Sequence, residues 1–170
     1  LVFEESCCEE EDDIKELDFS RFVKLRELKV GDYCFYKVEE LKLIGLKALE
    51  SVEIGQNSFT KHPYNTADGR DEKRQFYLKK CPRLKSLKIG YQSFARFTAC
   101  EIENVDALEV IEMGDKCFQY VNELKLIGLS KLESVVIGEN CFVDNDNRDP
   151  NCRFCLKNCS SLRELRIGCG

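Results

Sequence analysis

Long apolar stretches are missing from this sequence of 170 residues, in which no apolar run has the length of a membrane-spanning helix. A transmembrane segment is therefore not expected, because a helix needs about 20 consecutive apolar residues to cross a bilayer. The first residues also lack the charged and then apolar pattern of a secretory signal peptide. With 43% hydrophobic and 34% charged residues, the composition is that of a soluble protein.

Histidine is almost absent, since it occurs only at His62, in a segment rich in turn-forming residues. A cysteine–histidine nucleophile needs a cysteine beside the histidine and a third group that orients the histidine. The sequence shows no such arrangement. An enzyme is therefore not expected, and no cofactor is expected either.

Complete metal-binding sequences are also lacking. Cys152, Cys155 and Cys159 lie close together, but a structural zinc site needs four tetrahedral ligands and no fourth ligand is evident. Residues 144–149 resemble a calcium loop, yet arginine stands at the fifth position and the required later glycine and glutamate are missing. No metal site is therefore expected, while the spacing leaves open a local disulfide between Cys152 and Cys155.

Basic residues are absent from residues 1–13, although seven acidic residues occur there. The rest of the chain holds 24 acidic and 26 basic residues, so a net charge of −5 combines an acidic tail with a nearly neutral body. We expect residues 1–13 to form an acidic N-terminal tail, either solvated or acting as an electrostatic docking arm. Residues 14–170 are expected to form one domain, whose first unit is either bare on its outer side or covered by the tail.

A repeat of 24 residues is the strongest feature that is present, and a recurring glycine marks it. Two insertions, of 11 and 6 residues, interrupt the repeat near residues 60–70 and 143–149. A fixed period in this range is typical of a solenoid. The repeated glycines are Gly31, Gly55, Gly90, Gly114, Gly138 and Gly168.

Apolar residues occupy fixed positions around each glycine. Apolar residues stand one and three positions before each glycine, and this alternation predicts a short strand with one buried face. Apolar residues twelve and fourteen positions before the glycine predict a second short strand of the same kind. The position nine before it, which is Phe22 in the first unit, is also expected to point inward. The glycine itself should supply either a positive φ or a close backbone approach. Phenylalanine stands four residues after five of the glycines, at Phe35, Phe59, Phe94, Phe118 and Phe142.

The pattern Leu-x-x-Leu-x-Ile-Gly-x-x-Ser-Phe at residues 84–94, preceded by Cys81, resembles leucine-rich repeats. It looks most like the BspA-like group of bacteria and protists, and the resemblance covers roughly residues 14–170. The proline that often follows the first strand in that group is lacking here. The resemblance implies a mainly β solenoid with two short parallel sheets and about six coils of 24 residues. It also implies recognition of a protein or surface, without catalytic residues.

Most cysteines follow the repeat, which favours small buried thiols over a disulfide framework. Free thiols favour a reducing, cytoplasmic compartment, whereas the family resemblance implies the cell surface or secretion as the alternative. Neighbouring thiols such as Cys117 and Cys141 are expected to come close to bonding distance. One repeat position is shared by Cys34, Ser58, Ser93, Cys117 and Cys141, and another holds both Cys81 and Cys159.

Charged residues occupy the outward position of the strands that precede the glycine, and their signs alternate over the first four units. They form either a self-satisfied ladder that maintains register or a polar recognition strip. They are Lys29, Glu53, Lys88 and Glu112, followed by Val136 and Arg166. Neither predicted sheet carries the basic stripe that nucleic-acid binding requires.

Tyrosines flank the phenylalanine position on the edge that carries the insertions. They are expected either to be exposed and to form a contact surface, or simply to cap the corner. They are Tyr33, Tyr36, Tyr91 and Tyr120, and Tyr64 and Arg70 lie within the first insertion.

These features together favour a non-enzymatic module that binds a protein partner through one sheet face, the inserted loops and the tyrosine edge. The alternative is a structural or scaffold component that joins a larger assembly or filament by end-to-end stacking. Stacking is considered because no obvious polar cap closes either end, and terminal units of a solenoid normally need one. We expect protein partners or self-association, with neither nucleic-acid binding nor membrane insertion.

Overall fold

The computed structural model describes residues 1–8, 14–60, 73–121, 123–143 and 153–168. The described residues form thirteen strands and no helix, and every strand pair is parallel. The predicted mainly β class with parallel sheets is therefore confirmed. Within these ranges, no helical segment has the length and apolar character needed to cross a bilayer.

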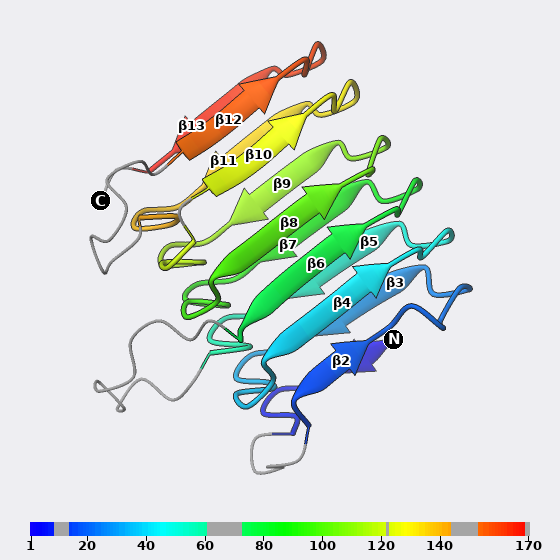
Figure 1. Cartoon of the computed structure of the whole chain (residues 1–170), viewed down its shortest axis with the longest axis vertical. Coiled ribbons are helices and arrows are strands. Elements are labelled where there is room, and N and C mark those ends of the chain that lie inside the picture. The colour runs from blue at the N-terminus through cyan, green and yellow to red at the C-terminus, as the bar shows by residue number, and fades with distance from the viewer. Residues whose placement is uncertain (9–13, 61–72, 122, 144–152, 169–170) are drawn as a thin grey trace.

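The odd-numbered strands form one continuous sheet of seven strands, in their order along the chain (Figure 1). The sheet consists of β1 (Val2–Phe3), β3 (Glu27–Val30), β5 (Ser51–Ile54), β7 (Ser86–Ile89), β9 (Val110–Met113), β11 (Ser134–Ile137) and β13 (Glu164–Ile167).

The even-numbered strands form the opposite layer, which is interrupted. Four of them make one sheet, and the last two make a separate pair that is not hydrogen-bonded to β8. The four-stranded sheet consists of β2 (Glu16–Asp18), β4 (Glu40–Ile44), β6 (Gln75–Lys79) and β8 (Ala99–Glu103), and the pair of β10 (Glu123–Ile127) and β12 (Arg153–Lys157). The chain thus passes from one layer to the other after almost every strand.

The pairing register follows the sequence repeat. Leu28 lies opposite Val52, which stands 24 positions later in the sequence. Val52 lies opposite Leu87 although 35 positions separate them, so the first insertion does not disturb the register. Equivalent side chains of successive units therefore lie side by side.

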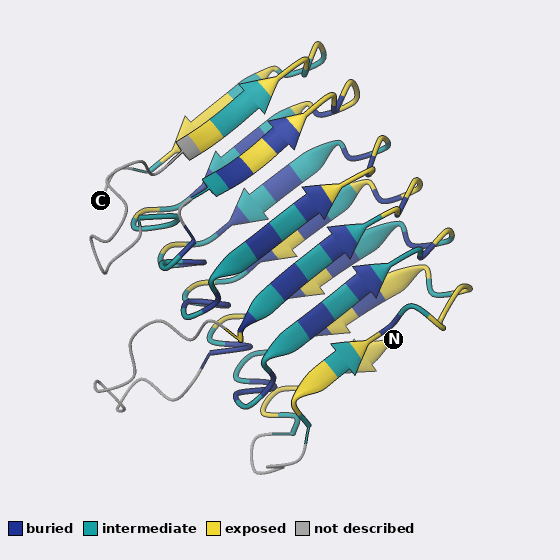
Figure 2. Cartoon of the chain, in the orientation of Figure 1, coloured by how far each residue is buried: buried dark blue, intermediate teal, exposed yellow. Residues whose placement is uncertain are grey.

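The core lies between the two layers, and buried residues alternate with more exposed ones along the inner strands (Figure 2). The repeated phenylalanines stack through this core, with centroid separations of 4.7 Å for Phe59–Phe94 and 5.0 Å for Phe94–Phe118. Each fully buried ring contributes about 1.5–3 kcal/mol through burial. The predicted inward position is confirmed for Phe35, Phe59, Phe94 and Phe118, and Phe142 is half-buried.

The repeated glycines are required by close backbone approach, which was one of the two expectations. A Cβ added at Gly90 would lie 2.6 Å from the Gln56 nitrogen, and one at Gly114 would lie 2.7 Å from the Tyr91 nitrogen. The expectation of a positive φ at these glycines is wrong. Positive φ occurs instead at the phenylalanines, for example 56° at Phe59.

Four residues expected to point into the core, Phe22, Phe154, Leu165 and Ile167, are exposed because they lie in the outermost units. Phe22 is 54% exposed, whereas Leu46 at the same repeat position in the next unit is fully buried. Leu165 and Ile167 of β13 are 47% and 45% exposed, since no described strand lies beyond β13.

Residues 1–8 cover the outer side of the first unit. Of the two expectations for that side, bare or covered by the N-terminal residues, the structure shows the covered one. The Gly31 amide donates to the Phe3 carbonyl, as the Gly55 amide donates to Val30. The Phe3 ring packs edge-on against Phe35, with the centroids 5.0 Å apart. Residues 1–8 therefore repeat the second half of a unit, a likeness that the sequence signals only weakly through Cys7.

Candidate functional site

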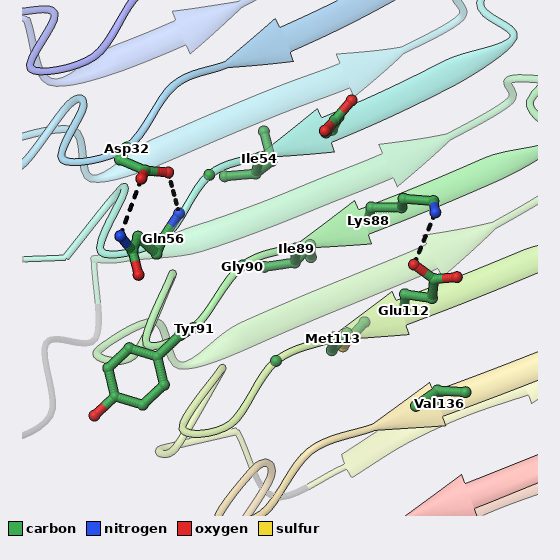
Figure 3. A pocket seen from close by; sticks show the side chains of 13 residues that line it. Asp32, Ile54, Gln56, Lys88, Ile89, Gly90, Tyr91, Glu112, Met113 and Val136 are labelled. Carbon is green, nitrogen blue, oxygen red and sulfur yellow. Dashed lines mark hydrogen bonds and ion pairs between the residues drawn. The ribbon is translucent and has the colours of Figure 1, made fainter.

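The outer face of the seven-stranded sheet carries a hollow of about 600 Å³ along the ends of β5, β7 and β9 (Figure 3). Four of the predicted binding residues line it, namely Glu53, Lys88, Glu112 and Tyr91. We call this hollow the sheet groove. Its lining also includes Asp32, Ile54, Gly55, Gln56, Ile89, Gly90, Met113, Gly114 and Val136.

The strand geometry explains why these residues meet. Side chains alternate between the two faces of a strand, so the residue between two buried positions points outward. Lys88 stands between buried Leu87 and Ile89 and is itself exposed. Parallel pairing in register then places Glu53, Lys88 and Glu112 next to one another on adjacent strands.

The glycines leave the groove without side chains at one end. Gly55, Gly90 and Gly114 directly follow the last residues of β5, β7 and β9 and line the groove there. Because the backbones of successive units approach too closely for a Cβ at these positions, bare main chain forms this part of the surface.

The charged residues are paired along the sheet. The Lys88 ammonium lies 2.8 Å from a Glu112 carboxylate oxygen, and Lys29 lies 3.6 Å from Glu53. The hydrogen bond from Lys88 to Glu112 raises the pKa of Lys88. These pairs are solvent-exposed, so water screens them and they contribute little to stability. The geometry therefore fits a ladder of charge pairs that maintains the register of adjacent strands. The same pairs leave both positive and negative groups on the surface of the sheet.

Aspartates that directly follow two of the glycines fix the corner beside the groove, and the sequence analysis missed them. Asp32 Oδ1 accepts a hydrogen bond from the Gln56 amide at 2.8 Å, and Oδ2 accepts one from the Gln56 side chain at 3.0 Å. Asp115 accepts from the Glu139 amide at 2.9 Å. The available signal was the Gly-Asp sequence in two equivalent units.

The tyrosines do not form one exposed surface. Tyr91 is 38% exposed, and the Lys116 ammonium lies 5.6 Å from its ring centroid. Tyr33 and Tyr120 are half-buried. Tyr36 is only 8% exposed, so the expectation of an exposed side chain is wrong at this position.

Arg74 is a buried charged residue that bonds to the main chain of neighbouring units, and nothing in the repeat pattern predicts it. Its guanidinium donates to the Tyr36 carbonyl at 3.0 Å and to the Phe59 carbonyl at 3.4 Å, and it lies 5.9 Å from the Phe97 ring centroid. The side chain is 1% exposed, although arginine is rarely buried so completely. Arg74 therefore ties together the segments that flank the first insertion.

The remaining predicted residues lie away from the groove. Arg166 belongs to β13 and bonds to Glu164 at 2.9 Å. Lys29 contacts Glu53 from the neighbouring strand β3 without lining the groove. Tyr64 and Arg70 lie outside the described residues.

All nine cysteines within the described ranges are free, as predicted for them. Burial raises the pKa values of Cys81 and Cys100. The interaction with Cys141 raises the pKa of Cys117, and the interaction with Cys117 lowers that of Cys141. The approach of this pair to bonding distance stays a prediction. Cys152, with its proposed disulfide, and the calcium-like residues 144–149 lie outside the described part of the chain.

Among the described residues, no group of three or more histidine, cysteine, aspartate or glutamate side chains has a geometry that could hold a metal ion. The site is therefore a polar groove with a tyrosine at its edge, set on a continuous parallel sheet. Comparisons with protein-family models, with curated proteins and with solved structures give no match to this chain.

Proposed function

We propose that this chain is a non-enzymatic, protein-binding module built as a leucine-rich-repeat solenoid of about six coils, similar to the BspA-like group. The strand order supports a solenoid, because the chain alternates between two layers and each strand pairs with its equivalent in the next unit. The 24-residue spacing of paired positions supports the repeat length.

The sheet groove carries the binding proposal. It combines both signs of charge, an exposed tyrosine and accessible main chain on a surface that four successive strands of the sheet, β5, β7, β9 and β11, hold in register. Tyrosine is enriched at the anchor positions of protein interfaces because it offers a large apolar ring with a polar tip. A face with charges of alternating sign is better suited to binding a protein surface that carries both signs of charge than to binding nucleic acid, because a phosphate backbone requires a basic face.

The test is affinity capture with the whole chain as bait, followed by identification of the partner and measurement of its affinity. Tyr91→Ala and Lys88→Ala should each weaken partner binding about tenfold or more, as expected for interface anchors. Tyr77→Ala on the opposite layer is the matched control, because Tyr77 lies on β6 and does not line the groove. Equal binding by wild-type protein and both groove variants would remove the groove from the proposal.

Self-association is the second candidate function, and the exposed apolar residues of the outermost units favour it. Phe22 and Val23 are 54% and 55% exposed in the first unit, and Leu165 and Ile167 are exposed on β13. A stack of copies would bury these side chains end to end. Sedimentation should then show association that rises with concentration and is lost in Leu165→Lys with Ile167→Lys. A monomer at all concentrations would count against stacking.

A further inference from the structure

The turns that lead from the even-numbered to the odd-numbered strands lie in a row along one long edge of the molecule (Figure 1). The first three turns close with the same hydrogen bond, since the Leu25, Leu49 and Leu84 amides donate to the carbonyls three residues earlier. Because the flanking strands pair in register, equivalent residues of successive turns lie about one strand spacing, roughly 4.8 Å, apart. The turn edge is our name for the tips of these three turns, residues 21–24, 45–48 and 80–83.

Basic side chains gather on the turn edge. Its three tips hold five basic residues and no acidic residue, whereas the equivalent tips of the other three units, residues 104–107, 128–131 and 158–161, hold one of each. All five basic side chains are exposed. They are Arg21, Lys24, Lys47, Lys80 and Arg83.

Carboxylates neutralise only part of this charge. Glu50 lies 3.4 Å from the Arg83 guanidinium and 3.1 Å from that of Arg26, so one carboxylate serves two cations. Within the described part of the chain, Lys24 and Lys47 take part in no ion pair. The turn edge therefore keeps a net positive charge.

Lys80 is not the residue that its backbone favours. Its φ is 55°, and other units hold Gly45, Asn104, Gly128 and Asn158 at this position. Glycine and asparagine adopt the left-handed region more readily than lysine does. Lys116 is the other lysine with a positive φ, and it lies 5.6 Å from the Tyr91 ring centroid. Among the described residues, Lys80 forms neither an ion pair nor a ring contact, so its ammonium group is directed only to solvent.

Two exposed apolar side chains lie among the basic ones. Phe22 and Val23 are 54% and 55% exposed, and they stand between Arg21 and Lys24. The position of Val23 is exposed in every other unit as well, so the turn itself directs this side chain outward. The other units hold Lys47, Pro82, Asp106, Ser130 and Ser160 there.

We propose that the turn edge is a second interaction site, which docks the protein onto an anionic lipid surface. Anionic headgroups attract basic side chains, and exposed aromatic and aliphatic groups enter the interfacial region of a bilayer. Stable attachment needs two signals, and the turn edge supplies a basic cluster together with an apolar pair. An acidic polypeptide would match the charges, but it would not require apolar side chains at a turn tip.

This site is separate from the sheet groove and does not depend on it. The tips at residues 45–48 and 80–83 precede β5 and β7, whereas the groove lies where these two strands end. Docking through the turn edge therefore leaves the groove open to a protein partner. Tyr91→Ala should leave lipid binding unchanged.

Vesicle flotation with the whole chain tests the proposal, because self-associated protein without lipid does not float. The chain should bind vesicles of phosphatidylcholine with phosphatidylserine at least tenfold more tightly than vesicles of phosphatidylcholine alone. Binding should also weaken as salt rises, since salt screens exposed charges. Equal binding to both kinds of vesicle would overturn the proposal.

The variants take their new residues from other units of the same chain, so the fold should tolerate them. Lys24→Ala copies Ala48, and Lys80→Asn copies Asn104. Together they should weaken binding to the anionic vesicles about twentyfold, roughly fivefold for each charge removed. Val23→Ser copies Ser130 and should weaken binding without any change in charge. Urea denaturation should show unchanged or higher stability for Lys80→Asn, which separates lost binding from unfolding.

The matched control removes the same charge away from the turn edge. It combines Lys116→Asn, which copies Asn57 at another positive φ, with Lys125→Ala on β10. This control should bind the anionic vesicles as the wild-type chain does. A loss as large as that of Lys24→Ala with Lys80→Asn would show that net charge alone governs binding, and would overturn the site. Polyglutamate binding as tight as vesicle binding and unaffected by Val23→Ser would identify an acidic polypeptide as the occupant, and would overturn lipid docking.

Discussion

Glycine occurs in this chain for two different physical reasons at the scale of single residues. Gly90 is needed because the Gln56 backbone would lie 2.6 Å from an added Cβ. Gly45 has no atom within 4 Å of an added Cβ but adopts a φ of 73°. Asn104 and Asn158 take the place of Gly45 in other units, with φ values of 55° and 56°. The first kind of position excludes any side chain, whereas the second accepts asparagine.

Substitution to asparagine separates the two kinds of glycine. Gly90→Asn should lower the free energy of unfolding by about 1–3 kcal/mol, because the new side chain has no space against the neighbouring backbone. Gly45→Asn should change it by less than about 0.5 kcal/mol, since asparagine tolerates the left-handed region. Urea denaturation measures both. Equal stability of the two variants would contradict the close-approach explanation.

Parallel strands in register are the elements that bring the groove together, and their charge pairs maintain that register. Lys88→Glu places like charges on β5, β7 and β9 and should cost about 0.2–1 kcal/mol of stability. Glu112→Lys in the same chain should restore the β7–β9 pair and recover part of that loss. Denaturation at low and high salt checks this, because salt should shrink the effect. An effect independent of salt would show that the loss is not electrostatic.

The sequence predicts most elements of the fold, because strand positions follow directly from the alternation of apolar residues. Ile89 and Leu87, for example, identify β7 and its inward face. The break between β8 and β10 could not be predicted, since Glu101 and Lys125 resemble the outward residues of paired strands. The burial of Tyr36 was not predicted either, since in the sequence Tyr36 resembles the other tyrosines that flank the phenylalanine position. Three-dimensional contacts without a repeating pattern account for both misses.

The whole molecule differs between its middle and its outermost units. Inner units bury their apolar columns on both sides, as Leu46 and Leu84 show. Outer units have a neighbour on one side only, so Phe22, Leu165 and Ile167 remain exposed. Residues 1–8 partly cover one side, where Phe3 packs on Phe35 and Phe19.

Truncation of Phe3 tests whether the N-terminal segment belongs to the folded body. Phe3→Ala should lower the free energy of unfolding by about 1.5–3 kcal/mol, because the ring is packed against two core phenylalanines. Phe22→Ala is the matched control and should stay within about 0.5 kcal/mol, because that ring is mostly exposed. A neutral Phe3→Ala variant would show that residues 1–8 contribute nothing to stability.

Through-space proton contacts measured by nuclear magnetic resonance test the central claim most directly, namely that equivalent residues of successive units lie side by side. The backbone protons of Lys88 should show contacts to both Glu53 and Glu112, 35 and 24 positions away in the sequence. Contacts from Lys88 to the preceding strand β6 in place of these two would mean hairpin pairing. That result would contradict the stacked arrangement and the groove built on it.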